Sequence, residues 1–109
     1  MPVLAILLFA LPGFAQTDRA NLEGTVTDSS GGSISGATVR ILQKETKQEL
    51  ERRSNPEGLY RFPAIAPGTY SVTVTNPGFK TKVNTRVKLD AGETYTLDVR
   101  LDVGAATDR

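Results

Sequence analysis

The apolar residues of this 109-residue chain recur at every second position over most of its length. A two-residue period places successive side chains on opposite faces of a strand, whereas a helix needs a period near 3.6 residues. The segment from Tyr70 to Val74 shows this pattern clearly, because Ser and Thr separate its apolar residues. Turn sequences such as Pro67-Gly68 and Pro77-Gly78 interrupt the pattern. The alternation therefore predicts short strands with one buried and one solvated face.

About seven such strands predict an all-β fold, an antiparallel seven-stranded β-sandwich. A parallel α/β sheet is excluded, because no segment between strands has the pattern of a crossover helix. The charged strand expected at 48–53 is predicted to lie at a sheet edge, where charge discourages pairing with other chains. The residues of inward parity form the predicted core: Leu22, Val26, Val39, Ile41, Tyr60, Phe62, Tyr70, Val72, Val74, Phe79, Val83, Val87, Leu89, Tyr95, Leu97, Val99 and Leu101.

The last two predicted strands are expected to pair as a hairpin around Gly92, provided that they lie in the same sheet. Exposed pairs of opposite charge contribute about 0.2–1 kcal/mol each, so they set the register more than the stability. The expected cross-strand pairs are Leu89 with Tyr95, Arg86 with Asp98, and Lys82 with Asp102.

The first 15 residues have the composition of an export signal. The apolar run Val3–Leu11 is about half as long as a membrane span. Pro12-Gly13 and the small residue Ala15 then precede polar residues, which predicts cleavage before Gln16. No Lys or Arg precedes the run, so a buried N-terminal strand or helix is the alternative.

The chain is thus expected to divide into a signal peptide at 1–15, a linker at 16–20, one domain at 21–102, and a linker or truncated C-terminus at 103–109. No membrane-spanning segment is expected after removal of the signal. Because the sequence has no Cys, no disulfide can form, and the domain depends on its apolar core for stability.

The composition removes several classes of function. Without His or Cys, the chain cannot form a Ser-His-Asp triad, a Cys nucleophile, or a thiolate or imidazole metal site. Calcium needs about six to eight oxygen ligands, but Asp28, Asn55 and Glu57 lie on separate predicted turns. The acidic residues fall in turns and on solvated faces, which disfavours paired-carboxylate catalysis. We expect no catalytic residue, no cofactor and no metal.

The charge balance also bears on partners. The 13 Lys and Arg against 12 Asp and Glu give a net charge of +1, which does not favour nucleic acid as a partner. One local feature is a row of basic residues at alternate positions that could face an anionic partner, although solubility alone also accounts for such a row. This basic row consists of Lys80, Lys82, Arg86 and Lys88.

Sugar-binding sandwiches expose aromatic rings, whereas the aromatic residues after the signal all have inward parity. Core packing is therefore the favoured interpretation of these rings. Tyr70 directly follows the Pro67-Gly68 turn, and we expect its hydroxyl to bond back to that turn, as a corner tyrosine does.

Several short motifs, in a fixed order, resemble those of carboxypeptidase regulatory-like domains. Residues 22–28 (LEGTVTD) and 34–39 (ISGATV) are similar to the opening of these domains, and 55–62 (NPEGLYRF) to their central turn. The Pro-Gly-aromatic turns at 67–70 and 77–80 resemble their two later turns. Asn55 stands where the family often has Asp, which leaves a role in the turn. The resemblance implies a non-catalytic, transthyretin-like (prealbumin-like) Greek-key sandwich.

Together with a signal peptide, the chain resembles the start of Oar-like TonB-dependent outer-membrane receptors. That resemblance implies a fragment of a receptor, with a periplasmic domain that docks a protein partner or the receptor's own downstream plug and barrel. The expected location is then the periplasm or outer membrane. The alternative is a secreted carbohydrate-binding module of a larger extracellular protein, with polysaccharide as its ligand. An enzyme is the third and least favoured class.

Overall fold

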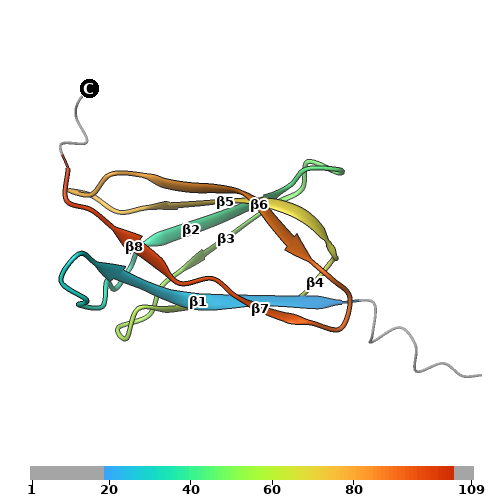
Figure 1. The fold of residues 1–109 in the computed structure, drawn as a ribbon, viewed down its shortest axis with the longest axis horizontal. Helices are drawn as coiled ribbons and strands as arrows, with labels where there is room; N and C mark the ends of the chain where they lie inside the picture. Colours follow the sequence, from blue (N-terminus) through green and yellow to red (C-terminus); the bar gives the residue numbers. More distant parts are fainter. Residues whose placement is uncertain (1–18, 105–109) are drawn as a thin grey trace, which may run out of the picture.

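A computed structural model of the chain describes residues 19–104, which form two β-sheets packed face to face (Figure 1). The expected signal peptide at 1–15, residues 16–18 of the expected linker, and residues 105–109 lie outside the described residues. No helix between residues 19 and 104 is long and apolar enough to cross a membrane. The strands are β1 (Ala20–Asp28), β2 (Thr38–Gln43), β3 (Glu49–Arg53), β4 (Leu59–Ile65), β5 (Gly68–Thr75), β6 (Lys82–Leu89), β7 (Thr94–Thr96) and β8 (Val99–Leu101).

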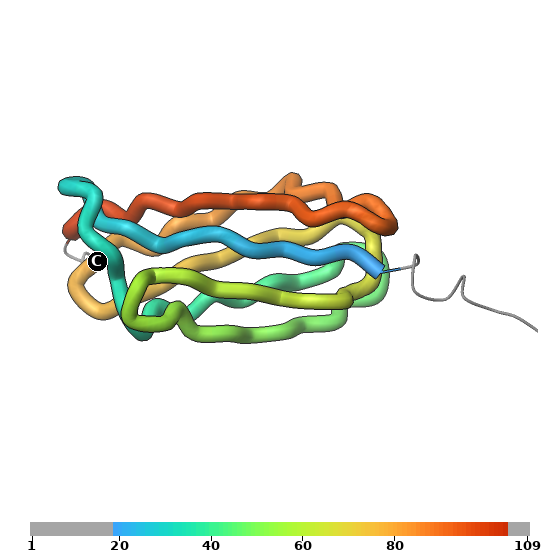
Figure 2. Tube along the Cα trace, turned by 90° about the horizontal axis from the view of Figure 1, so that it is seen from below, coloured from blue at the N-terminus to red at the C-terminus, as the bar shows by residue number. Residues whose placement is uncertain are grey.

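The two sheets have the strand orders β4-β1-β7, with β8 also pairing with β1, and β3-β2-β5-β6. Figure 2 shows β1 lying between β4 and the β7–β8 segment. The all-β sandwich is confirmed, and β3 lies at a sheet edge as its charge predicted. Two details of the prediction are wrong: the number of strands and the purely antiparallel pairing. Eight strands are present, and both β7 and β8 run parallel to β1.

The eighth strand arises because the last predicted strand is interrupted at Leu97 and Asp98. Leu97 N–H donates to the carbonyl oxygen of Glu23 at 2.8 Å. At the next step along β1, the N–H of Thr25 donates to the side-chain Oδ1 of Asp98 at 3.0 Å. A carboxylate thus replaces a backbone acceptor at this point, and β7 and β8 become separate strands.

The hairpin expected around Gly92 is wrong, because β6 and β7 lie in different sheets. Residues 90–93 carry the chain from one sheet to the other, so β7 pairs with β1 instead of β6. None of the three predicted cross-strand pairs forms: Leu89 with Tyr95, Arg86 with Asp98, or Lys82 with Asp102.

The core between the sheets contains most of the apolar residues of inward parity. Phe62, Leu22 and Ile41 are the largest of the fully buried side chains. The buried hydrophobic residues outside the predicted core are Ala20, Ile34, Ala37 and Ile65, and Ala20 belongs to β1 although it falls in the expected linker. Ser54 is a buried polar residue, and its hydroxyl donates to Ile34 O at 2.7 Å and accepts from Ala37 N–H at 2.9 Å.

Four residues of the predicted core are not fully buried. Phe79 and Leu97 are partly buried and pack against the core. Val83 is 53% exposed, because a bulge in β6 shifts its alternation by one residue. Two steps along β5, from Tyr70 to Val72, correspond to three steps along β6, so Val83 lies opposite the outward-facing Thr73.

Tyr95 is the second clear exception to the predicted core, with 36% of its surface exposed. It lies in register with the buried Leu22. Its strand, β7, ends the β4-β1-β7 order, so no further strand of residues 19–104 covers the ring from the edge side. Parity alone did not distinguish such an edge position from a central one.

Two turn predictions are confirmed. The Oδ1 of Asn55 accepts hydrogen bonds from Glu57 N–H and Leu59 N–H, both at 2.9 Å, which is the expected role of this side chain in the turn. The hydroxyl of Tyr70 donates to the carbonyl oxygen of Ala66 at 2.6 Å and so bonds back across the Pro67-Gly68 turn.

The turn after β1 contains Asp28, a carboxylate whose hydrogen bonds can be tested by a pH titration. Asp28 Oδ1 accepts from Ser30 Oγ at 2.7 Å and from Gly32 N–H at 2.9 Å. These bonds, the Ser30 hydroxyl first, lower the pKa of Asp28 below its ordinary value of 3.8. Since the folded pKa is the lower one, the stabilisation is present above pH 3.8 and is lost as the pH falls through the folded value.

We expect an NMR titration of the Asp28 carboxyl carbon to give a midpoint below pH 3.8, and the S30A substitution to raise it. S29A is the matched control, because the donors to this carboxylate are Ser30 N–H, Ser30 Oγ and Gly32 N–H and not the Ser29 hydroxyl. A midpoint that S30A leaves unchanged would contradict the assigned cause.

Candidate functional site

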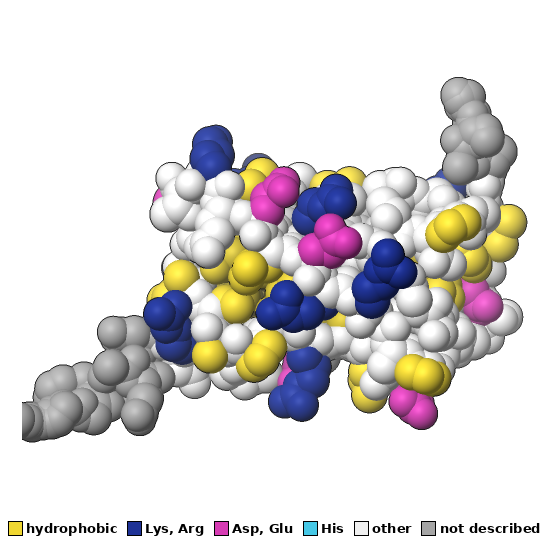
Figure 3. Space-filling model, turned by 180° about the vertical axis from the view of Figure 1, so that it is seen from behind, with side chains coloured by type: hydrophobic (Ala, Val, Ile, Leu, Met, Phe, Trp, Pro, Cys, Tyr) yellow, Lys and Arg dark blue, Asp and Glu magenta, His cyan; other side chains and the backbone are white. Residues whose placement is uncertain are grey.

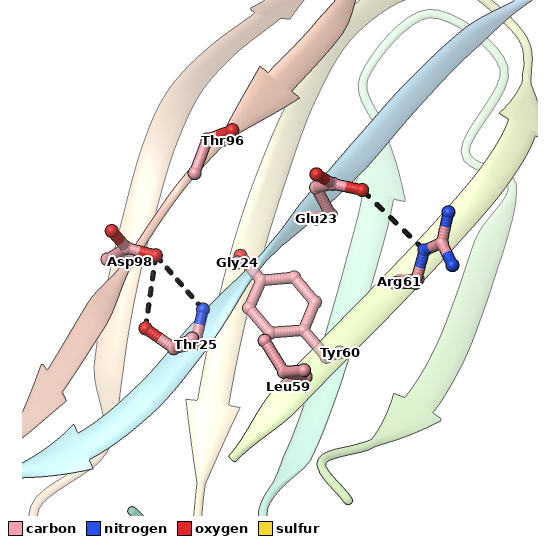
Figure 4. A pocket seen from close by; sticks show the side chains of 8 residues that line it. All are labelled: Glu23, Gly24, Thr25, Leu59, Tyr60, Arg61, Thr96 and Asp98. Carbon is pink, nitrogen blue, oxygen red and sulfur yellow. Dashed lines mark hydrogen bonds and ion pairs between the residues drawn. The ribbon is translucent and has the colours of Figure 1, made fainter. Parts of the chain in front are cut away.

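A shallow pocket of about 380 Å³ lies on the outer face of the β4-β1-β7 sheet. It forms because alternate side chains of β1 point outward and are flanked by outward residues of β4 on one side and of the β7–β8 segment on the other. Figure 4 shows the lining residues, which are Glu23, Gly24, Thr25, Leu59, Tyr60, Arg61, Thr96 and Asp98.

The charged groups of this outer-face pocket bind one another. Asp98 Oδ1 accepts from Thr25 N–H at 3.0 Å and from Thr25 Oγ1 at 3.1 Å, as the dashed lines in Figure 4 mark. Glu23 Oε1 lies 3.5 Å from Arg61 Nε in an ion pair that is exposed to solvent. Both carboxylates of the pocket are therefore used within the sheet, one to hold a strand and one to pair with a neighbouring strand.

The floor of the pocket depends on Gly24. A Cβ placed there would lie 1.9 Å from the carbonyl oxygen of Leu97, so only glycine lets the β7–β8 segment approach β1 this closely. The hydroxyl of Tyr60 donates to the same Leu97 oxygen at 2.5 Å. Burial of the phenol, and then the negative charge of Asp98, raise the pKa of Tyr60 well above its ordinary value. Tyr60 thus remains protonated, and its hydrogen bond links β4 to the β7–β8 segment.

This arrangement does not favour sugar binding in the pocket. A sugar ring is bound by stacking on an exposed aromatic face, but Tyr60 is 2% exposed and is the pocket's aromatic residue. Tyr95, the more exposed aromatic residue at 36%, is not among the lining residues. The outer face of this sheet therefore has the polar, internally paired character of a solvated sheet face.

The bulge in β6 divides the predicted basic row between two faces. Lys82 lies opposite Val74 and shares its inward side, whereas Lys88 lies opposite Thr69 on the outward side. Arg86 lies at the bulge itself, where its N–H donates to Asn84 Oδ1 at 3.3 Å. Lys80 precedes the strand. All four basic residues are exposed and follow one sheet edge, but they do not form the single-faced row that strict alternation predicted.

The sequence did not reveal a second, smaller groove, of about 100 Å³, between β6 and the β7–β8 segment. It could not be found from the sequence as long as these strands were expected to pair with each other. Its lining residues are Val72, Val74, Lys82, Val83, Asn84, Leu97, Asp98 and Val99. Lys82 is the member of the basic row that borders this edge groove.

The opposite side of the molecule has a different character. Figure 3 shows basic side chains there, interspersed with acidic ones over a partly apolar surface. Arg40 and Glu51 form an ion pair at 3.2 Å, and the guanidinium of Arg52 lies 5.5 Å from the centre of the Phe62 ring.

No group of metal-ligating side chains occurs within residues 19–104. The oxygens of Asp28 and Asn55, which were considered for calcium, accept hydrogen bonds within their own separate turns.

Solved structures with a similar fold belong to functionally diverse proteins. The TIE protein of Bacillus anthracis is 18% identical, with a TM-score of 0.65 over 79% of this chain and 17% of that one. A putative carbohydrate-binding protein of Bacteroides uniformis is 17% identical, with a TM-score of 0.64 over 76% and 41%. Catechol 1,2-dioxygenase of Pseudomonas arvilla is 14% identical, with a TM-score of 0.62 over 83% and 54%.

At these identities the likeness establishes the sandwich fold and nothing about a ligand or reaction. The chain spans at most 54% of the length of these three proteins. No curated protein sequence matches it. The family comparison, in contrast, matches residues 21–102. With this match over most of its length, and with the two-sheet fold described above, the chain belongs to the carboxypeptidase regulatory-like domain family.

Proposed function

We propose that this domain is a non-catalytic, exported module with a structural or docking role, and that it is the N-terminal periplasmic domain of a TonB-dependent outer-membrane receptor. One observation carries the docking role. Strand β6 pairs with β5 along one edge only, and no strand within residues 19–104 pairs with its other edge. An unpaired edge with a groove beside it offers backbone groups and side-chain space to a partner.

The polar side chains of the outer-face pocket are hydrogen-bonded or ion-paired within the sheet, which supports a non-catalytic role. Catalysis by paired carboxylates requires an acid and a base held in one cleft with separated pKa values. In the outer-face pocket, Asp98 accepts two hydrogen bonds from Thr25, and Glu23 is paired with Arg61. Tyr60, the group in the pocket with a strongly raised pKa, is held as a hydrogen-bond donor to a backbone carbonyl.

The receptor setting is supported by two features of the sequence. The apolar segment before Gln16 has the length of a signal peptide and ends in the small residue Ala15, as a cleavage site does. A domain of this family follows directly. In that setting the sandwich lies in the periplasm and holds or docks neighbouring domains.

Intact-mass analysis of the native product, combined with membrane fractionation, tests this proposal. We expect a mature chain that begins at Gln16, fractionates with the outer membrane and exceeds 109 residues. An unprocessed product in the cytosol would contradict export. A secreted product that is retained on a polysaccharide matrix would instead support the carbohydrate-binding alternative.

A further inference from the structure

The free edge of β6 and the edge groove beside it, together called the slot, lie between two points at which the two sheets are joined. At one end, residues 90–93 cross between the sheets. At the other end, Phe79 forms a bridge with Val103, and Lys80 N–H donates to Asp102 O at 2.8 Å. Between these ends, β6 and the β7–β8 segment lie at the same side of the sandwich without pairing, as Figure 1 shows.

Apolar side chains make up most of the lining of the slot, and Lys82, Asn84 and Asp98 complete it. Val72 and Val74, both nearly fully buried, line the edge groove together with Leu97 and Val99. The groove has a volume of about 100 Å³, which suits small aliphatic side chains. An extended segment presents a side chain to the same face at every second position, so alternate aliphatic residues would reach this groove.

The β6 side of the slot carries basic side chains, whereas Asp98 lines the other side with its Oδ1 accepting two hydrogen bonds from Thr25. Within residues 19–104, neither Lys82 nor Arg86 forms an ion pair, whereas Lys88 lies 3.7 Å from Asp90. The same charges oppose pairing of two copies of this chain. Antiparallel pairing of two β6 strands about residue 85 would set Lys82 against Lys88, and pairing about residue 86 would set Arg86 against itself. Like charges directly opposite each other destabilise both of these registers, whereas the cations without an ion pair attract an acidic segment.

We propose that the β6 edge binds an extended, acidic segment of a protein partner by strand addition. Its backbone pairs with β6, its acidic side chains face Lys82 and Arg86, and its alternate aliphatic side chains enter the edge groove. This inference deepens the docking role proposed above and rests on it.

The test is an NMR titration of the full chain with a synthetic peptide of alternating Glu and Val. We expect amide shifts confined to β6 and to residues 97–99, and binding that weakens with added salt. The double variant K82E/R86E should lower the affinity at least about tenfold, because two attractive contacts become repulsive. The matched control K44E/K47E changes the net charge equally in the β2–β3 loop and should leave the affinity unchanged.

Two further peptides keep the proposal falsifiable. A peptide of alternating Lys and Val should fail to bind because it repels β6. An acidic peptide in which consecutive Pro-Pro pairs replace every second Glu-Val pair should also fail, because it lacks N–H donors on whichever edge faces β6. Equal binding of the Pro peptide would show a general attraction of anions and overturn strand addition. Shifts at β3 or β4, or no binding of the Glu-Val peptide, would also overturn it. None of these peptide-binding results depends on where the native product is located. A failure of strand addition is therefore distinct from a failure of the receptor proposal.

Discussion

Replacing Gly24 with alanine is expected to destabilise the domain by about 3 kcal/mol, at the upper end of the usual cost of overpacking. The new Cβ would lie 1.9 Å from the carbonyl oxygen of Leu97 and 2.6 Å from its carbonyl carbon. Both are backbone atoms, so no side-chain rotation relieves the clash. Moving them apart also breaks the Tyr60–Leu97 hydrogen bond and separates the β7–β8 segment from β1.

Equilibrium urea denaturation followed by circular dichroism measures this change. The control is G36A, because a Cβ at Gly36 meets nothing within 4 Å but forces alanine into a backbone conformation with φ of 79°. That strain alone costs about 1–2 kcal/mol. If G24A were no more destabilising than G36A, Leu97 would not be held against Gly24 as described.

The second large effect is expected at Phe62, the largest of the fully buried side chains. F62A should lower the free energy of unfolding by about 3–5 kcal/mol, because it removes a buried ring and leaves a cavity. The Phe62 ring also packs edge-on against Tyr60, with ring centres 6.1 Å apart, and lies beneath the guanidinium of Arg52. These contacts limit how far the surroundings can close the cavity.

Denaturation of F62A alongside L59A gives a comparison within one strand. Leu59 is on the opposite face of β4 and is 44% exposed, so its truncation should cost about 1 kcal/mol or less. Similar losses for the two variants would mean that Phe62 does not lie at the centre of the core.

Local features of the fold followed closely from the sequence. The turn role of Asn55, the bond from Tyr70 back to its turn, and the edge position of β3 each depend on a few neighbouring residues or on one strand's charge. A short-range pattern carries such information because the groups that interact are close in the chain.

The candidate sites were less predictable, because each depends on segments far apart in the chain. The outer-face pocket and its Gly24 floor require the carbonyl of Leu97, more than 70 positions away. The signal for it was slight: a glycine at an inward position of a strand marks a close backbone approach, but it does not name the partner. The edge groove was hidden by the expected hairpin around Gly92.

The sequence by itself determined that this protein is a β-sandwich, because a two-residue apolar period broken by Pro-Gly turns leaves no helical surface to bury. Only the tertiary structure decided which strands pair. Residues 90–93 pass to the other sheet, a bulge in β6 turns Val83 outward, and Asp98 divides the last strand in two. Parity gives each side chain a face within its own strand, whereas register and sheet membership arise from hydrogen bonds between distant segments.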